Sequence, residues 1–248
     1  MKHRLPLLLL LCLLQLPLWA QSFRVVGYLP YYRFGLADMV EFDKLTHLCL
    51  AFATPDAAGN LSVFGQDIDP IVTQAHDVNV EVLISFAGTP ESADNWTELT
   101  KAENRSDFIH KIMLFVEQHN LEGVDVDLEW GYVDENYSGF VLELRDSLDQ
   151  YGKLMTAALP GTTRYADLSD EAMFSYDFIN MMVYDLTGPW NPNNAGPHSP
   201  YYFALNSIAH WQNQGVPAED LTLGVPFYGY DFSNPSNVVS FTFGSMVG

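Results

Sequence analysis

The chain has 248 residues, 48% of them hydrophobic and 14% aromatic, with 31 acidic residues against 11 basic ones. This length can bury one large core, either as a single α/β barrel or as two small domains. Charged residues make up only 17% of the chain, so its composition is too apolar for a disordered protein. The formal net charge of −20 repels phosphate groups, and we therefore expect a neutral ligand and no nucleic-acid partner.

Residues 1–20 have the pattern of a signal peptide. A basic start precedes an apolar run from Leu5 to Trp19, which is short for a membrane span, and Ala20 offers a small residue for cleavage. We expect a mature chain of residues 21–248 that is secreted or periplasmic and has no integral membrane span. An uncleaved membrane anchor is the alternative. Cys49 is the only cysteine of that mature chain, so no internal disulfide is expected.

Strands and helices are predicted to alternate along the mature chain. Short runs rich in β-branched and aromatic residues predict strands at Arg24–Tyr32, Leu45–Ala53, Val80–Ala87, Gly123–Trp130, Leu154–Pro160, Phe178–Leu186 and Leu221–Tyr228. Helices are predicted at Ser106–Gln118, Glu135–Tyr151 and Tyr202–Gln214, and the first of them presents Ile109, Ile112, Met113 and Val116 on one face. The alternation implies right-handed βαβ units and a parallel sheet.

Seven such units approach an α/β fold of the (β/α)₈ type, the TIM barrel, without its eighth strand. The segment after Tyr230 is largely polar and shows no further strand pattern of this kind. We therefore expect residues 21–248 to form one barrel domain that is truncated before the eighth strand. An irregularly closed barrel is the alternative.

One predicted strand carries acidic residues at alternate positions. Asp125, Asp127 and Glu129 share one face, and the residues between them are Val and Leu. The apolar face should pack beneath the helices, which directs three carboxylates about 7 Å apart into the barrel. Crowding and burial raise the pKa of such groups, so that one of them can stay protonated as a general acid near neutral pH. A divalent-cation site is the alternative, although one strand cannot easily place three carboxylates around one ion.

This acidic segment resembles the fourth-strand signature of the family-18 glycoside hydrolases, the chitinase family, which reads Asp-Gly-x-Asp-x-Asp-x-Glu. The spacing from Gly123 through the three acids matches, and Glu122 stands where the family usually has Asp. Further segments resemble family motifs in the same chain order: Ser85–Gly88, Met182–Asp185, Gly188–Trp190, Gly196–Tyr201 and Gly224–Gly229. In these, Ala87 replaces a glycine, and Tyr230 stands where many members carry Arg. The resemblance covers the chain from about Arg24 to Tyr230.

The resemblance implies a retaining glycosidase that hydrolyses β-1,4 bonds of chitin or chito-oligosaccharides by substrate-assisted catalysis, with no cofactor and no metal. Glu129 would protonate the glycosidic oxygen, and Asp127 would hold the acetamido N–H of the substrate. Asp125 would share a proton with Asp127, and Tyr184 would donate to the acetamido oxygen. The residues expected to contact the sugar are Asp185, Met182, Tyr28, Phe52 and Trp190. Packing roles are expected for Trp96, Trp130 and Trp211.

Two other functions remain open. A sugar-binding lectin on the same scaffold is one, but relatives of that kind commonly lose the terminal glutamate, and Glu129 is present here. An endo-β-N-acetylglucosaminidase acting on N-glycans or cell-wall glycan is the other, and the Trp190 loop favours the chitinase. Without an eighth strand, the barrel would expose an unpaired edge and an apolar face. We expect the chain as written to be unstable or inactive, although its parent gene encodes an active enzyme.

Overall fold

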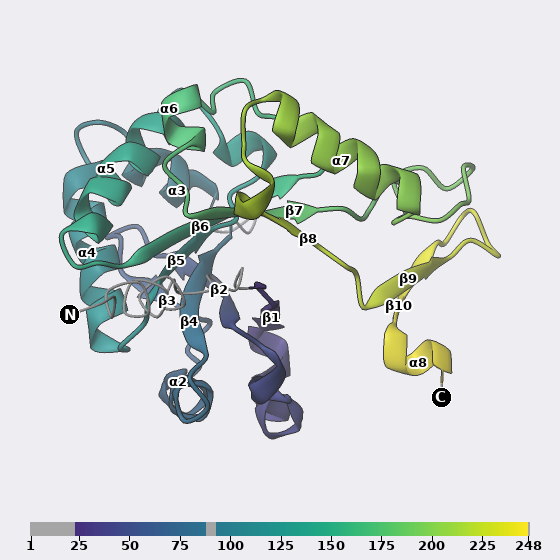
Figure 1. The fold of residues 1–248 in the computed structure, drawn as a ribbon, viewed down its shortest axis with the longest axis horizontal. Helices are drawn as coiled ribbons and strands as arrows, with labels where there is room; N and C mark the ends of the chain where they lie inside the picture. The colour runs from purple at the N-terminus through teal and green to yellow at the C-terminus, as the bar shows by residue number, and fades with distance from the viewer. Residues whose placement is uncertain (1–22, 88–92, 248) are drawn as a thin grey trace, which may run out of the picture.

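The structure, a computed structural model, describes residues 23–87 and 93–247 (Figure 1). The predicted signal peptide and Gly88 of the third-strand motif lie outside the described residues. No helix within these two ranges is long and apolar enough to cross a membrane.

Seven parallel strands form a curled sheet in the order β1-β2-β4-β5-β6-β7-β8. These strands are β1 (Val26–Pro30), β2 (His47–Pro55), β4 (Glu81–Phe86), β5 (Gly123–Val126), β6 (Leu154–Pro160), β7 (Phe178–Met182) and β8 (Leu221–Leu223). The short β3 (Leu61–Ser62) adds to β2 in antiparallel fashion. In the described part of the chain no strand joins β8 back to β1, so the fold is the predicted (β/α)₈ barrel, incomplete at the eighth unit.

Helices connect the strands and cover the outer face of the sheet (Figure 1). The α-helices are α2 (Asp69–His76), α3 (Ala93–Leu99), α4 (Arg105–Gln118), α5 (Tyr137–Asp149), α6 (Asp170–Met173), α7 (Tyr201–Asn213) and α8 (Phe243–Val247). Short 3₁₀ helices lie at η2 (Tyr31–Met39), η3 (Phe42–Lys44), η4 (Trp130–Tyr132) and η5 (Ala218–Asp220). The three predicted helices are confirmed as α4, α5 and α7. Gly152 and Gly215 follow the last two with positive φ, as expected of glycines that end a helix.

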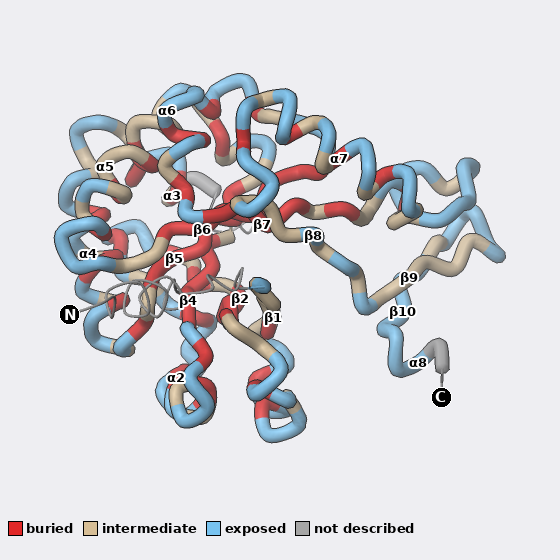
Figure 2. The backbone as a smooth tube through the Cα atoms, viewed as in Figure 1, coloured by how far each residue is buried: buried red, intermediate tan, exposed pale blue. Residues whose placement is uncertain are grey.

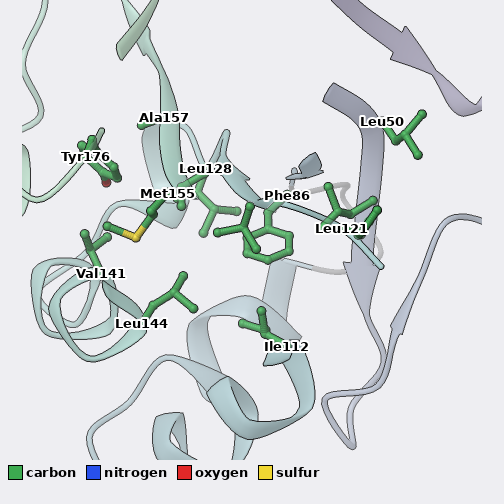
Figure 3. Packing of buried hydrophobic residues seen from close by; sticks show 14 of the residues in the cluster. Leu50, Phe86, Ile112, Leu121, Leu128, Val141, Leu144, Met155, Ala157 and Tyr176 are labelled. Atoms are coloured by element: carbon green, nitrogen blue, oxygen red, sulfur yellow. The ribbon is translucent and has the colours of Figure 1, made fainter. Parts of the chain in front are cut away.

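The core lies between the sheet and these helices. The predicted apolar face of α4 is buried, and the apolar residues alternating with the three acids are fully buried (Figure 3). Leu128 packs there among side chains of α5 and β6, such as Val141 and Met155. Figure 2 shows the buried backbone concentrated in the strands β2 to β7. Outward apolar packing therefore leaves the acidic face of β5 directed into the barrel, as the alternation predicted.

Four of the predicted strands run two or more residues beyond the observed strand ends. The strands expected to end at Tyr32, Trp130, Leu186 and Tyr228 instead end at Pro30, Val126, Met182 and Leu223. Beyond two of these ends the backbone leaves the extended region, with φ of 51° at Trp130 and 61° at Asp185. Residues other than glycine rarely adopt such φ values, and an extended strand cannot continue past a residue with positive φ. Trp130 instead begins the 3₁₀ helix η4, and Asp185 lies in the loop after β7.

A hairpin follows β8, although no strand was predicted after Tyr230. Strand β9 (Tyr228–Asp231) pairs in antiparallel fashion with β10 (Val239–Thr242), and the two form a separate small sheet (Figure 1). The stretch leading into it carries exposed apolar side chains, including Val225 at 65% and Phe227 at 76% exposure. Apolar side chains are therefore exposed on the open side of the barrel, next to the unpaired edge of the sheet.

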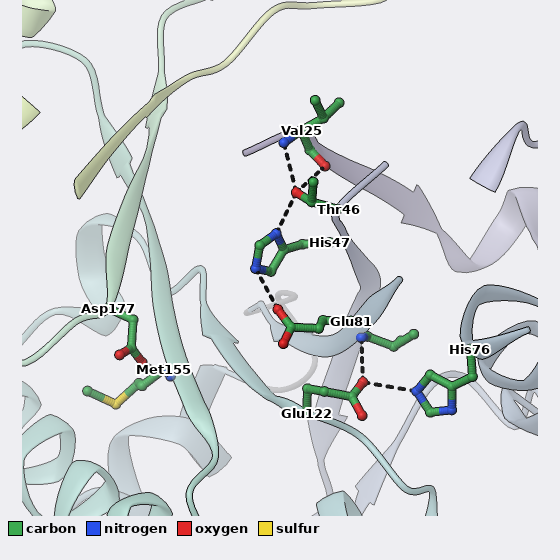
Figure 4. Close-up of polar contacts among 9 residues, drawn as sticks. Val25, Thr46, His47, His76, Glu81, Glu122, Met155 and Asp177 are labelled. Carbon is green, nitrogen blue, oxygen red and sulfur yellow. Dashed lines mark hydrogen bonds and ion pairs between the residues drawn. The ribbon is translucent and has the colours of Figure 1, made fainter. Parts of the chain in front are cut away.

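Polar side chains connect the strands at their amino ends (Figure 4). Just before β5, Glu122 Oε2 accepts the backbone N–H of Val82 at 2.7 Å and lies 3.0 Å from His76 Nε2 on α2. Just before β7, Asp177 Oδ2 accepts the backbone N–H of Met155 at 2.8 Å in the same way. Each carboxylate thus helps to hold the register between two neighbouring strands. Glu122, which stands where the motif described above usually has Asp, links β4, β5 and α2.

Candidate active site

The three acids of the β5 segment lie at increasing exposure along the chain. Asp125 is inside β5 and fully buried, Asp127 follows the strand at 9% exposure, and Glu129 is only half-buried. They are therefore ordered from the barrel interior toward the carboxyl-end loops, where barrel enzymes carry their active sites. A substrate entering from these loops would meet Glu129 first.

Asp125 is held by four donors from four different strands. Its Oδ2 accepts the hydroxyls of Tyr28 on β1 at 2.8 Å and Ser85 on β4 at 2.7 Å. Its Oδ1 accepts the hydroxyl of Thr156 on β6 at 2.6 Å and the amide of Asn180 on β7 at 3.2 Å. The strand register explains two of these contacts, because Ser85 and Thr156 lie directly opposite Asp125. Burial raises the pKa of Asp125, and the four hydrogen bonds act in the opposite direction.

These contacts leave Asp125 no role as a ligand for a cation. Both carboxylate oxygens already accept two hydrogen bonds each, which fills their acceptor capacity. In the described ranges, no group of three or more His, Cys, Asp or Glu side chains could hold a metal ion.

Asp127 has the opposite environment to Asp125. Its Oδ1 is buried and has no hydrogen-bond partner in the structure. Burial raises the pKa of Asp127 well above its ordinary value, and the negative charges of Asp125 and Glu129 add to this. A buried acceptor without a partner is costly, so this oxygen is suited to receive a donor from a ligand.

Glu129 keeps its proton more readily than an ordinary glutamate. Burial raises the pKa of its carboxyl, and the charge of Asp185 raises it further, whereas the Trp130 side chain lowers it. A carboxyl in such an environment is suited to general-acid chemistry.

The loop after β7 brings three more of the predicted residues to this mouth. Met182 ends the strand and is half-buried, like Tyr184 and Asp185, which follow it. Burial raises the pKa of the Tyr184 hydroxyl, as do the charges of Asp127, Glu129 and Asp185, so that it remains a proton donor. Asp185 Oδ1 accepts the hydroxyls of Tyr228 at 2.6 Å and Tyr230 at 2.9 Å.

A comparison with family models matches residues 24–245 to "Glycosyl hydrolases family 18". The chain belongs to this family. Among solved structures, the family-18 chitinase ChiB from the chitin utilization locus of Flavobacterium johnsoniae has 50% sequence identity and a TM-score of 0.88, covering 90% of this chain and 74% of that one. A chitinase from Bacteroides thetaiotaomicron has 28% identity and a TM-score of 0.73, covering 86% of this chain and 70% of that one.

Curated relatives include chitinases and chitinase-like proteins. A "chitinase-like effector" of Moniliophthora perniciosa is 28% identical over 79% of this chain, and one of Moniliophthora roreri is 27% identical over 92%. The chain spans 52% and 64% of the length of these two relatives.

Within the family-18 barrel, the remaining predicted sugar contacts are dispersed. Tyr28 donates its hydroxyl to Asp125, and the residue as a whole is 39% exposed on the edge strand β1. Phe52 lies half-buried where the pairing of β2 with β4 shifts register. Trp190 is 60% exposed and packs edge-on against Tyr230, with ring centroids 5.9 Å apart. Of these three, Trp190 presents the most accessible surface for a sugar ring.

The three tryptophans predicted to pack do not all do so. Trp96 and Trp211 are buried, and their indole N–H groups donate to the carbonyls of Ala87 and Pro160 at 3.1 Å. For Trp130 the prediction was wrong, because its side chain is 65% exposed. Its positive φ turns the residue out of the strand direction at the mouth, beside Glu129.

Residues of the family-18 site that sequence reasoning missed are Thr156 and Asn180, which hold Asp125, and Tyr228 and Tyr230, which hold Asp185. A signal existed for the first two. Thr156 is the single polar residue of the predicted strand Leu154–Pro160, and Asn180 is the single polar residue between Phe178 and Val183. A buried polar group needs a partner. Tyr228 lies within the Gly224–Gly229 motif and Tyr230 directly follows it, but their contact with Asp185 depends on a hairpin that the sequence pattern did not reveal.

Proposed function

We propose that this chain is the catalytic barrel of an exported retaining glycosidase that hydrolyses β-1,4 bonds in chitin or chito-oligosaccharides. One observation carries the proposal: the unpartnered Oδ1 of Asp127, buried between a fully hydrogen-bonded Asp125 and a protonatable Glu129. An acetamido N–H is the donor that an N-acetylated sugar would bring to that oxygen.

In the first step, Glu129 donates its proton to the glycosidic oxygen while the bond from that oxygen to the anomeric carbon breaks. The acetamido oxygen of the same sugar forms the replacing bond to the anomeric carbon, so no protein nucleophile is required. The raised pKa of Glu129 keeps the needed proton in place near neutral pH.

Asp127 and Tyr184 orient the acetamido group for this attack. Asp127 accepts its N–H, which compensates the positive charge that develops as the ring closes, and Tyr184 donates its hydroxyl to the acetamido oxygen. Asp125 stays fixed by its four donors, and burial together with the negative charge of Asp125 favours the protonated form of Asp127 before the substrate binds. In the second step, water attacks the anomeric carbon and gives its proton to Glu129, while the bond from the acetamido oxygen to that carbon breaks. The two inversions at the anomeric carbon give net retention.

Relatives supply the substrate class. The Flavobacterium johnsoniae protein at 50% identity is described as a chitinase from a chitin utilization locus. A class V chitinase from tobacco, with the same fold at 23% identity, was solved with the tetramer NAG4. We extend the ligand class, oligomers of N-acetylglucosamine, to this chain.

Product analysis of N-acetylglucosamine hexamer tests the proposal. The wild-type chain should give shorter oligomers with retained anomeric configuration, and Glu129→Gln should give none. Cellohexaose has the same linkage without acetamido groups and should resist both proteins. Cleavage of cellohexaose would exclude the substrate-assisted mechanism, and equal activity of Glu129→Gln would exclude Glu129 as the general acid.

A sugar-binding protein without activity is the second candidate, and the open side of the barrel favours it. Tyr28, which helps to hold Asp125, lies at that open edge, so one wall of the site is incomplete in the described residues. Relatives named "chitinase-like effector" and "Chitinase-3-like protein 2" carry names that do not assert activity. Hexamer binding by folded wild-type protein and by Glu129→Gln, with no cleavage by either, would establish this candidate.

A further inference from the structure

His198 lies between Asp185 and the β9 hairpin, in the loop that precedes α7. Its side chain is only 12% exposed. The ring centroid is 5.1 Å from those of both Tyr228 and Tyr230. Neither the candidate mechanism nor the predicted sugar contacts uses this histidine.

The hydrogen bonds of His198 define which nitrogen carries the proton. Its Nε2 lies 3.1 Å from the carbonyl oxygen of Tyr228, which can only accept, so Nε2 is protonated. Its Nδ1 faces Asp185 twice, at 3.3 Å from the backbone N–H and at 3.2 Å from Oδ1. A neutral ring accepts the backbone N–H at Nδ1, whereas a protonated ring must donate to the carboxylate instead. The two hydrogen bonds exclude each other.

The titratable groups around this ring converge on Asp185. The hydroxyls of Tyr228 and Tyr230 donate to the same oxygen that Nδ1 faces. Burial and the hydrogen bond to Asp185 raise the pKa of both tyrosines, so neither loses its proton at neutral pH. Across the described residues, His198 is the only basic side chain paired with Asp185.

The negative charge of Asp185 also acts on the carboxyl of Glu129. Burial is the larger cause of the raised pKa of Glu129, and the charge of Asp185 is the second. A cation formed on His198 would lie against the carboxylate of Asp185 and offset its charge. Asp127, Glu129 and Tyr184 are further titratable groups at this mouth.

We propose that His198 is a positioning residue whose protonation switches its bond from the Asp185 backbone to the Asp185 carboxylate and so changes the charge presented to Glu129. When the His198 ring is neutral, the charge of Asp185 is not compensated and favours the protonated form of Glu129. When the ring is charged, it offsets the charge of Asp185, and Glu129 loses its proton more readily. This inference rests on the proposed role of Glu129 as the acid, and it makes catalysis sensitive to pH through a group that never touches the substrate.

The Glu129 carboxyl can be titrated by carbon-13 NMR without any activity. Gln in place of His198 retains an N–H for the Tyr228 carbonyl but forms no cation. In His198→Gln, Glu129 should therefore hold its proton to higher pH, with an acid dissociation constant about threefold lower than in the wild type. His110→Gln, on the exposed face of α4, is the matched control and should leave Glu129 unchanged. An unchanged or higher dissociation constant in His198→Gln would overturn the proposal.

A second measurement needs no variant and covers the case in which His198→Gln does not fold. Nitrogen-15 shifts of the His198 ring should show a proton on Nε2 only at high pH and on both nitrogens at low pH. The Asp185 backbone amide should lose its hydrogen bond in the same transition. An Asp185 amide that does not titrate with His198 would refute the switch. Both readouts are independent of chitin cleavage, so an inactive chain would refute the proposed function alone.

Discussion

Replacing Thr156 by Val tests the view that Asp125 is fixed by a buried hydrogen-bond network. The hydroxyl of Thr156 donates to Asp125 Oδ1 at 2.6 Å, and both residues are fully buried. Val has nearly the same shape, so packing is retained while the donor is lost. A hydrogen bond to a charged group contributes about 1.5–3 kcal/mol, and we expect a free energy of unfolding lower by about 2 kcal/mol at neutral pH. For a domain of this size, the Tm should fall by about 4–8 °C.

The loss in the free energy of unfolding of Thr156→Val, relative to the wild type, should grow as the pH rises. Burial already raises the pKa of Asp125 in the folded protein, and the Thr156 bond is the strongest of the contacts that lower it. Without that bond, the folded pKa rises further above the unfolded value of about 3.9. An acid with a raised folded pKa loses stability as pH rises from the unfolded to the folded value. The variant should therefore be closest to the wild type below about pH 4 and furthest from it near neutral pH.

Urea denaturation of the wild type and variant at several pH values measures this difference. Thr156→Ser keeps the hydroxyl and should therefore show little of the pH-dependent loss of stability expected for Thr156→Val. Thr162→Val, at an exposed threonine of the loop after β6, controls for the loss of a hydroxyl as such. If Thr156→Val were as stable as Thr162→Val at every pH, the network would not be what holds Asp125.

Three further predictions concern the mouth of the barrel and the export of the chain. Asp185→Asn should lower the pKa of Glu129, and the fall of kcat/KM on the basic side should move to lower pH; an unmoved limb would show that Asp185 does not act on Glu129. Trp190→Ala should raise KM for the hexamer about fivefold, for a stacking contact of about 1 kcal/mol, with little change in kcat; an unchanged KM would exclude stacking on this indole. Mature protein isolated from culture medium or periplasm should begin at Gln21 by amino-terminal sequencing, and retention of residues 1–20 would support a membrane anchor.

The fold and the centre of the site were readable from the sequence because both follow local periodicity. Alternation of acids with Val and Leu was enough to direct Asp125, Asp127 and Glu129 inward, since a strand with one apolar face has a single way to bury it. The buried face of α4 followed from its helical spacing for the same reason. Motif order then placed Tyr184 and Asp185 beside these acids.

The network behind Asp125 was not readable, because its partners come from strands far apart in the chain. Thr156 and Asn180 look like ordinary polar interruptions until strand register brings them to one point. Strand ends were overestimated at Trp130 and Asp185 because composition does not reveal a positive φ at a non-glycine residue. The exposure of Trp130 follows from that same local geometry.

The bond from Asn180 to Tyr28 has a consequence for the order in which the molecule forms. The Asn180 amide donates to the Tyr28 hydroxyl at 2.9 Å, across a separation of 152 residues in the chain. Such a contact requires closing a very long loop, which occurs late in folding. A nascent chain that has not yet reached Asn180 therefore carries all three acids but lacks one of the four donors that hold Asp125. The hydrogen-bond network around Asp125 is therefore complete only once β7 has joined the sheet.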